Sequence, residues 1–120
     1  MNSAADKSHR TAEALYLCAF FSQNDVSAQG GEQAYQILDA AKRVYAAQCG
    51  PWSMHNRPDW RAAADVALSL ADSETDPLRA QCARLMWSHC WREITRGTRD
   101  QTSAGRMWRG TLRTLHSMEK

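Results

Sequence analysis

The chain has 120 residues, the size of one domain, and 43% of them are hydrophobic. A chain of this length buries about two-thirds of the surface that it exposes when unfolded, so a core can form without disulfides or metals. The formal net charge is only +2 and the sequence pI is near 8.5, below what a dedicated DNA-binding domain commonly shows.

No targeting segment or membrane span is visible. The first ten residues, MNSAADKSHR, lack the apolar core of a signal peptide. The longest apolar run covers residues 14 to 21, whereas a helix that crosses a bilayer needs about 20 apolar residues. We therefore expect a soluble protein without a membrane partner.

The four cysteines are not spaced as a disulfide framework or a zinc motif, and no CxxC is present. They are Cys18, Cys49, Cys82 and Cys90. Cys82 and Cys90 fall on one predicted helix, separated by a rise of about 12 Å that no disulfide spans. We interpret all four as reduced thiols, which predicts a cytoplasmic protein, and we expect no metal and no cofactor.

The first predicted helix starts near Ser3 or Asp6, both suitable N-caps, and ends at about Asn24. Its run ALYLCAFF has apolar side chains on every side. This pattern is typical of a helix enclosed by neighbours, and it leaves a homodimer as an alternative because one face could serve a second subunit. Residues 25 to 31, DVSAQGG, then predict a polar connection.

The second predicted helix begins at Glu32, whose charge suits the positive end of the helix dipole. It ends at Cys49, before Gly50 and Pro51. One stripe at helical spacing is expected to face the core. The stripe comprises Ala34, Ile37, Leu38, Ala41, Val44, Tyr45 and Gln48.

Residues 50 to 58 form the longest irregular stretch, and four of its side chains are candidate loop contacts. They are Trp52, Met54, His55 and Arg57. Large side chains in a loop either fold back as a plug or stay exposed for binding, and the sequence leaves both open. His55 and Cys49 would be half of a metal site, but no further ligands nearby complete it.

The third predicted helix opens at Pro58 or Asp59 and reaches Asp72 or Ser73. Its alanines indicate close packing. The side chains expected to face inward are Trp60, Ala63, Ala64, Ala67, Leu70 and Ala71.

Residues 76 to 97, DPLRAQCARLMWSHCWREITRG, predict the helix around which the others pack. Asp76 supplies a capping carboxylate, Pro77 suits the first helical position, and Gly97 ends the helix. Two apolar stripes leave only a narrow polar arc, so we expect this helix to lie between its neighbours. The polar arc comprises Gln81, Arg84, Ser88, Arg92, Thr95 and Arg96.

The last predicted helix runs from a Ser103 cap to Met118 and carries the clearest functional feature. Its expected buried stripe comprises Ala104, Trp108, Thr111, Leu112, Leu115 and Met118. On another face, five basic residues fall within an arc of about 80°. This basic ridge comprises Arg106, Arg109, Arg113, His116 and Lys120. A merely solvated face has the same pattern, so the ridge predicts a binding surface without establishing one.

Charge is unevenly distributed along the chain. Residues 59 to 78 carry five acidic and one basic side chain, whereas residues 79 to 113 carry eight arginines and two acidic side chains. Such asymmetry bears on partners and not on the fold. The acidic block could equally face the basic one within the domain.

No catalytic motif is found: there is no glycine-rich phosphate loop, no GxGxxG and no HExxH. His89 and Cys90 are adjacent, but on a helix they diverge by about 100° and do not make a nucleophile and its base. The acidic side chains lie on expected solvent faces, where nothing raises a pKa for acid or base catalysis. We therefore expect a protein that is not an enzyme.

We expect one all-α domain over residues 1–120, an irregular bundle of about five helices that works by binding. Tryptophan and arginine are the residues that most often carry binding energy at interfaces, and the chain has five tryptophans. The expected partner-binding residues are Arg84, Arg92, Arg96, Arg106, Arg109, Arg113, His116 and Lys120. The expected partner is a protein or a protein–nucleic acid complex.

By analogy, a domain of this size and character fits a regulator or stoichiometric inhibitor, including those that phages and mobile elements make against host nucleic-acid machinery. The alternative is direct, largely sequence-independent DNA or RNA binding by the same arginines. Phosphate contacts from arginine and stacking on tryptophan would serve that function.

Overall fold

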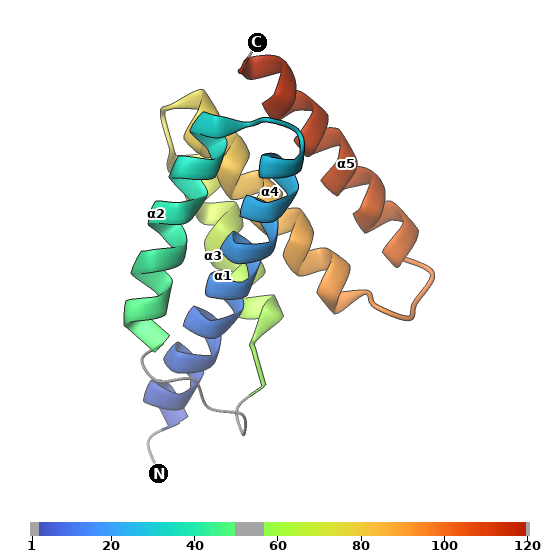
Figure 1. The fold of residues 1–120 in the computed structure, drawn as a ribbon. Helices are drawn as coiled ribbons and strands as arrows, with labels where there is room; N and C mark the ends of the chain where they lie inside the picture. Colours follow the sequence, from blue (N-terminus) through green and yellow to red (C-terminus); the bar gives the residue numbers. More distant parts are fainter. Residues whose placement is uncertain (1–2, 50–56, 120) are drawn as a thin grey trace.

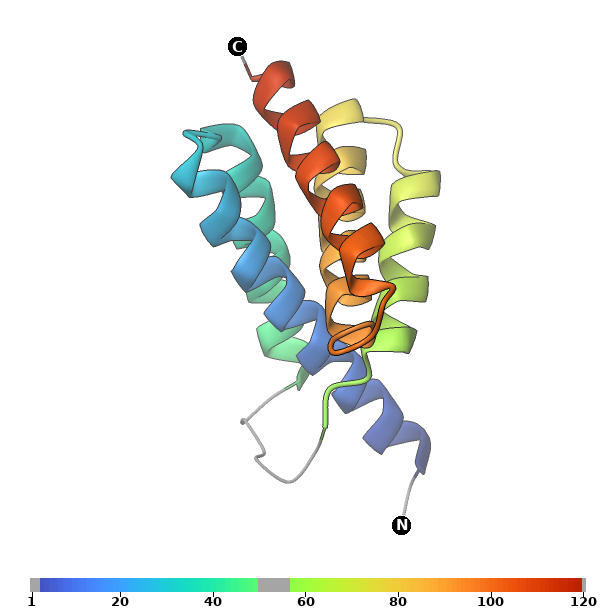
Figure 2. The ribbon, with the colours of Figure 1, turned by 90° about the vertical axis from the view of Figure 1, so that its right-hand side faces the viewer.

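The computed structural model describes residues 3–49 and 57–119, and over this part of the chain it is an all-α bundle of five helices (Figure 1). The helices are α1 (Ser3–Ala28), α2 (Glu32–Cys49), α3 (Trp60–Ser73), α4 (Pro77–Ile94) and α5 (Gln101–Met118). The predicted fold class is confirmed. The N-terminus of α1 and the C-terminus of α5 lie at opposite ends of the bundle (Figures 1 and 2).

The start of α3 and of α4 follows the predicted capping chemistry. The Asp59 carboxylate accepts a hydrogen bond of 3.0 Å from the backbone N–H of Ala62. Asp76 accepts one of 3.0 Å from the backbone N–H of Arg79, and Pro77 occupies the first turn of α4. Each carboxylate satisfies an N–H that has no partner within its helix.

The predicted end of the first helix at Asn24 is wrong, because α1 continues through Asp25 to Ala28. Val26 is only 2% exposed and belongs to the core, so burial of its side chain favours the extra turn. The chain reverses instead at Gly30, whose φ of 78° is in the left-handed region that glycine tolerates. Likewise, α5 begins at Gln101, before the predicted cap at Ser103.

Helix α4 lies between its neighbours, as predicted: it packs against each of the other four helices, as α1 also does. Leu85 and Cys90 on this helix are fully buried. All five helices contribute to one core, which includes Leu15 of α1, Leu38 of α2 and Leu115 of α5. In Figure 2, α5 lies along α4, with α1 and α2 on one side and α3 on the other.

The polar arc of α4 is narrower than predicted, because Ser88 and Thr95 are buried. The Ser88 hydroxyl donates to the Leu85 carbonyl at 2.8 Å, and the Thr95 hydroxyl donates to the Trp91 carbonyl at 2.6 Å. A hydroxyl that donates a hydrogen bond to a carbonyl of its own helix can be buried, because its donor is then satisfied. Helical periodicity alone does not reveal this.

Four side chains expected to face inward are exposed instead, and the polar Gln48 is one of them. Val44 is 53% exposed, Leu70 is 42% exposed and Met118 is 40% exposed. Val44 of α2 and Leu70 of α3 flank an open groove over α4, so neither reaches the core.

The C-terminal end of the described chain closes onto the start of α2. The Glu119 carboxylate accepts hydrogen bonds from the backbone N–H groups of Gln33 at 2.6 Å and Ala34 at 3.2 Å. An acidic group at a helix N-terminus is favoured both by these orphan donors and by the helix dipole. Glu119 thus caps a helix that lies more than eighty residues earlier in the chain.

Candidate binding surface

The basic ridge lies on the outer side of α5. Arg106, Arg109, Arg113 and His116 are all exposed, while Leu112 and Leu115 face the core. Within residues 3–49 and 57–119, no carboxylate forms an ion pair with any of these four side chains. The ridge therefore presents cationic groups that a partner could neutralise. Its predicted last member, Lys120, lies outside the described residues.

Arg92 is held at the junction of three helices and is only partly exposed. Its guanidinium lies 4.4 Å from the centre of the Trp108 ring, a cation–π contact between α4 and α5. The Trp108 indole N–H donates to the Asp25 carboxylate of α1 at 3.1 Å. Burial raises the pKa of Asp25, although the Arg92 charge and the Trp108 hydrogen bond act in the opposite sense. Arg92 therefore helps to attach α5 to the rest of the bundle.

Arg84 and Arg96, the other two arginines of the predicted surface, are exposed and already have acidic neighbours. Arg84 lies 3.8 Å from the Asp72 carboxylate on α3. Arg96 donates to the Glu93 carboxylate at 2.6 Å. Exposed pairs of this kind contribute little to stability, typically below about 1 kcal/mol. The structure directs Arg84 toward α3, away from Arg92 and Arg96, which line one cavity. It therefore does not gather all three of these arginines into one patch.

A polar cavity of about 270 Å³ lies where α1, α4 and the start of α5 meet. It is lined by Phe21, Asp25, His89, Arg92, Glu93, Arg96 and Gln101. His89 is only 6% exposed, and neither ring nitrogen has a hydrogen-bond partner in the described chain. The Glu93 carboxylate, 4.0 Å away, raises the pKa of His89, but burial has the larger effect and lowers this pKa to about 4. The imidazole is therefore neutral at physiological pH.

In the described part of the chain, His89 and Cys90 have different neighbours. The His89 ring stacks on Phe21, with 5.3 Å between ring centres, and meets Trp60 edge to face at 6.1 Å. The Cys90 sulfur instead lies 3.0 Å from the Cys18 sulfur. The predicted divergence of His89 and Cys90 on the helix agrees with these different neighbours.

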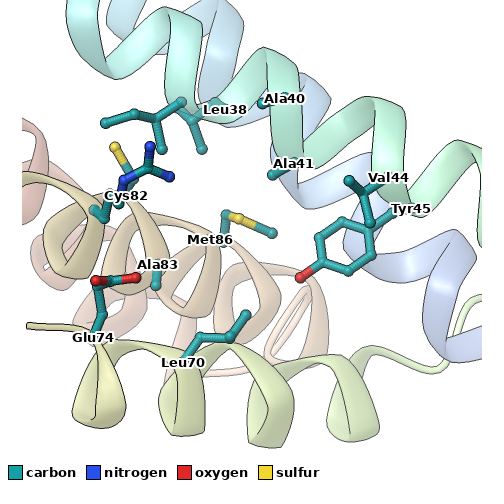
Figure 3. A pocket seen from close by; sticks show the side chains of 12 residues that line it. Leu38, Ala40, Ala41, Val44, Tyr45, Leu70, Glu74, Cys82, Ala83 and Met86 are labelled. Carbon is teal, nitrogen blue, oxygen red and sulfur yellow. The ribbon is translucent and has the colours of Figure 1, made fainter. Parts of the chain in front are cut away.

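An apolar groove of about 290 Å³ runs between α2 and α3, with α4 as its floor (Figure 3). In Figure 3, Val44 and Tyr45 on α2 face Leu70 on α3 across the groove, and Met86 of α4 lies between them. The sequence did not predict this groove, because Val44 and Leu70 were expected to face the core. Both side chains belong to apolar stripes, and such a stripe does not show how far α2 lies from α3.

Of the four predicted loop residues, only Arg57 lies within the described chain. Its carbonyl oxygen accepts a hydrogen bond of 2.7 Å from the Arg10 guanidinium, and the nearby Asp59 N–H donates to the Arg10 carbonyl at 3.0 Å. These bonds attach the chain before α3 to α1. The Arg57 side chain is exposed. Trp52, Met54 and His55 lie outside the described residues.

Comparison with protein-family models, with curated proteins and with solved structures finds no match. Among the described residues, no helix combines the length and apolar character needed to cross a bilayer. In the same part of the chain, no group of three or more His, Cys, Asp or Glu side chains is arranged to hold a metal ion.

Proposed function

We propose that this protein is a non-enzymatic helical binding protein, a regulator or stoichiometric inhibitor that acts on a protein or a protein–nucleic acid complex. The basic ridge of α5 is the contact surface. A phage or mobile-element origin, with host nucleic-acid machinery as the target, fits this size and character by analogy alone.

One observation carries the proposal. The ridge arginines 106, 109 and 113 are exposed without an acidic partner in the described chain, whereas Arg43, Arg84 and Arg96 each lie beside a carboxylate. Clustered cations of this kind steer and orient a partner of opposite charge.

Other side chains of α5 favour a protein partner. Met107 is 37% exposed and Met118 is 40% exposed on the same helix, on a face about 150° around it from the ridge at 100° per residue. Methionine and arginine are both enriched at protein interfaces. Trp108, in contrast, is engaged by Arg92 and Asp25, so its ring is not available for stacking on an unpaired base.

The test compares two triple variants in affinity capture from a bacterial lysate, with and without nuclease. The ridge variant carries Arg106→Glu, Arg109→Glu and Arg113→Glu. The control carries Lys7→Glu, Arg61→Glu and Arg79→Glu, three exposed positions on other helices, and changes the net charge equally. Circular dichroism checks that both remain helical.

We expect the parent protein and the control to capture the same discrete proteins after nuclease treatment, and the ridge variant to lose them. Equal capture by both variants would refute the assignment of the ridge. Loss of all capture on nuclease treatment would favour the alternative, direct nucleic-acid binding. In that case the affinity for random-sequence DNA should fall steeply with salt, by about 0.7 to 0.9 logarithmic units per tenfold salt for each phosphate contacted.

A further inference from the structure

The sulfur atoms of two buried cysteines on different helices are in direct contact, at a distance that an S–H···S hydrogen bond between the two thiols spans. The sulfur atoms of Cys18 on α1 and Cys90 on α4 are 3.0 Å apart, and both side chains are 0% exposed. Non-bonded carbon atoms rest about 3.5 to 4.0 Å apart, and a disulfide bond is about 2.05 Å long. The two sulfurs are therefore closer than ordinary packing requires.

The contact is specific to this pair. Cys82 is also buried, but its sulfur faces the Ala34 carbonyl oxygen at 4.0 Å. Cys18 and Cys90 belong to the common core, where α1 packs directly on α4. Close packing there limits how far either sulfur can move away.

We propose that Cys18 and Cys90 are an oxidative modification site, at which a small-molecule disulfide such as oxidised glutathione converts the two thiols into a disulfide that joins α1 to α4. The first cysteine thiolate attacks oxidised glutathione, forming a mixed disulfide and releasing one glutathione thiolate. The second cysteine thiolate then attacks the protein sulfur of the mixed disulfide and releases the other. The protein loses two electrons and two protons, and the oxidant becomes two molecules of reduced glutathione.

The burial of the pair determines when this reaction occurs. Because the thiolate is the attacking species, burial that raises the pKa of Cys18 slows its reaction in the folded protein. Glutathione also cannot reach a sulfur that is 0% exposed. The bond therefore forms during folding or transient opening, and the folded protein then shields it from reductants.

The linkage would strongly constrain the unfolded chain, because its ends are 72 positions apart. In the chain-entropy description, a loop of this length favours the folded state by several kilocalories per mole. For a chain of this size, we expect the midpoint of thermal unfolding to rise on the order of 10 °C. This inference rests on the sulfur geometry alone and is independent of the proposed partner surface.

The experiment refolds the denatured, fully reduced protein with a mixture of oxidised and reduced glutathione, and traps remaining thiols with an alkylating reagent. Mass spectrometry of the intact and of the trypsin-digested protein then locates any linkage. Cleavage after Lys and Arg, except where proline follows as at Arg57, places each cysteine in a different peptide. These peptides span residues 11–42, 44–61, 80–84 and 85–92.

We expect a product with two unalkylated cysteines and a linked pair of peptides 11–42 and 85–92. Native protein given the same mixture should oxidise at least tenfold more slowly. The variant Cys82→Ala should still form the linkage, whereas Cys18→Ser and Cys90→Ser should not. The peptide map of the parent protein decides the question even if a serine variant does not fold. Four alkylated cysteines after refolding, or a linkage through Cys49 or Cys82, would overturn the proposal.

Discussion

Helices α4 and α5 are equally long, 18 residues each, but they have opposite relations to the solvent. Helix α4 packs against four other helices, whereas α5 packs closely on α4 and more lightly on α1. Seven residues of α4 are buried, including the polar Ser88 and His89, against three of α5, all apolar. A helix with neighbours on most sides buries some of its polar side chains, while a helix with one free side can leave them in water.

The first test makes the same substitution in both helices. Leu85 of α4 is 0% exposed and Leu112 of α5 is 5% exposed. We expect Leu85→Ala to lower the free energy of unfolding by about 4 kcal/mol and Leu112→Ala by about 2 kcal/mol, because neighbours can relax into the cavity more readily beside a helix with one free side. Urea unfolding measures both values. A larger loss for Leu112→Ala would contradict the central role of α4.

The second test uses the buried histidine of α4 and the exposed histidine of α5. Folding lowers the pKa of His89 from 6.5 to about 4. Between these pH values the unfolded chain binds a proton on this side chain that the folded chain does not bind. Burial of the neutral His89 side chain therefore leaves the free energy of unfolding undiminished above about pH 6.5. As the pH falls to about 4, the free energy of unfolding decreases by about 3 kcal/mol on account of this side chain.

Urea unfolding at pH 7.5, 6.0 and 4.5 should show this loss in the parent protein. In His89→Gln the free energy of unfolding should fall much less over the same pH range, because most of the change of about 3 kcal/mol comes from His89. The matched variant His116→Gln, on the exposed face of α5, should follow the parent protein. An unchanged pH dependence in His89→Gln would show that His89 is not buried as a neutral ring.

The third test concerns the end of α5. Glu119→Ala removes the carboxylate that caps the first turn of α2, and we expect it to lower the free energy of unfolding by about 1 kcal/mol. Glu119→Gln keeps an acceptor oxygen without the charge and should cost less. If thermal unfolding of both variants matched that of the parent protein, the contact between α5 and α2 would not contribute to stability.

The smallest expected effect lies on the free side of α5. A β-carbon added at Gly110 would meet no atom within 4 Å, so Gly110→Ala should raise the free energy of unfolding by about 0.5 to 1 kcal/mol through helix propensity. Gly97→Ala is the opposing control. Gly97 has a φ of 79°, so alanine there should be destabilising by about 1 kcal/mol. A destabilised Gly110→Ala protein would show that another group covers this side of α5.

Local chemistry in the sequence determined much of the fold. The capping carboxylates Asp59 and Asp76 act on neighbouring residues, so the starts of α3 and α4 could be predicted from them. The predicted end of α4 is less accurate, because the helix ends at Ile94, three residues before Gly97. The two apolar stripes of α4 are also visible in the sequence, and they predicted that this helix lies between its neighbours. The spacing of Arg106, Arg109 and Arg113 likewise predicted that these side chains share one exposed face of α5.

Which of these residues contact one another depends on how the helices pack together. The Arg92–Trp108–Asp25 contacts, the Cys18–Cys90 pair and the Glu119 cap each join helices that are far apart in sequence. The exposure of Val44 and Leu70 depends on the separation of α2 from α3. Periodicity reports which face of a helix is apolar, but the neighbour that covers that face is chosen by the packing of the whole bundle.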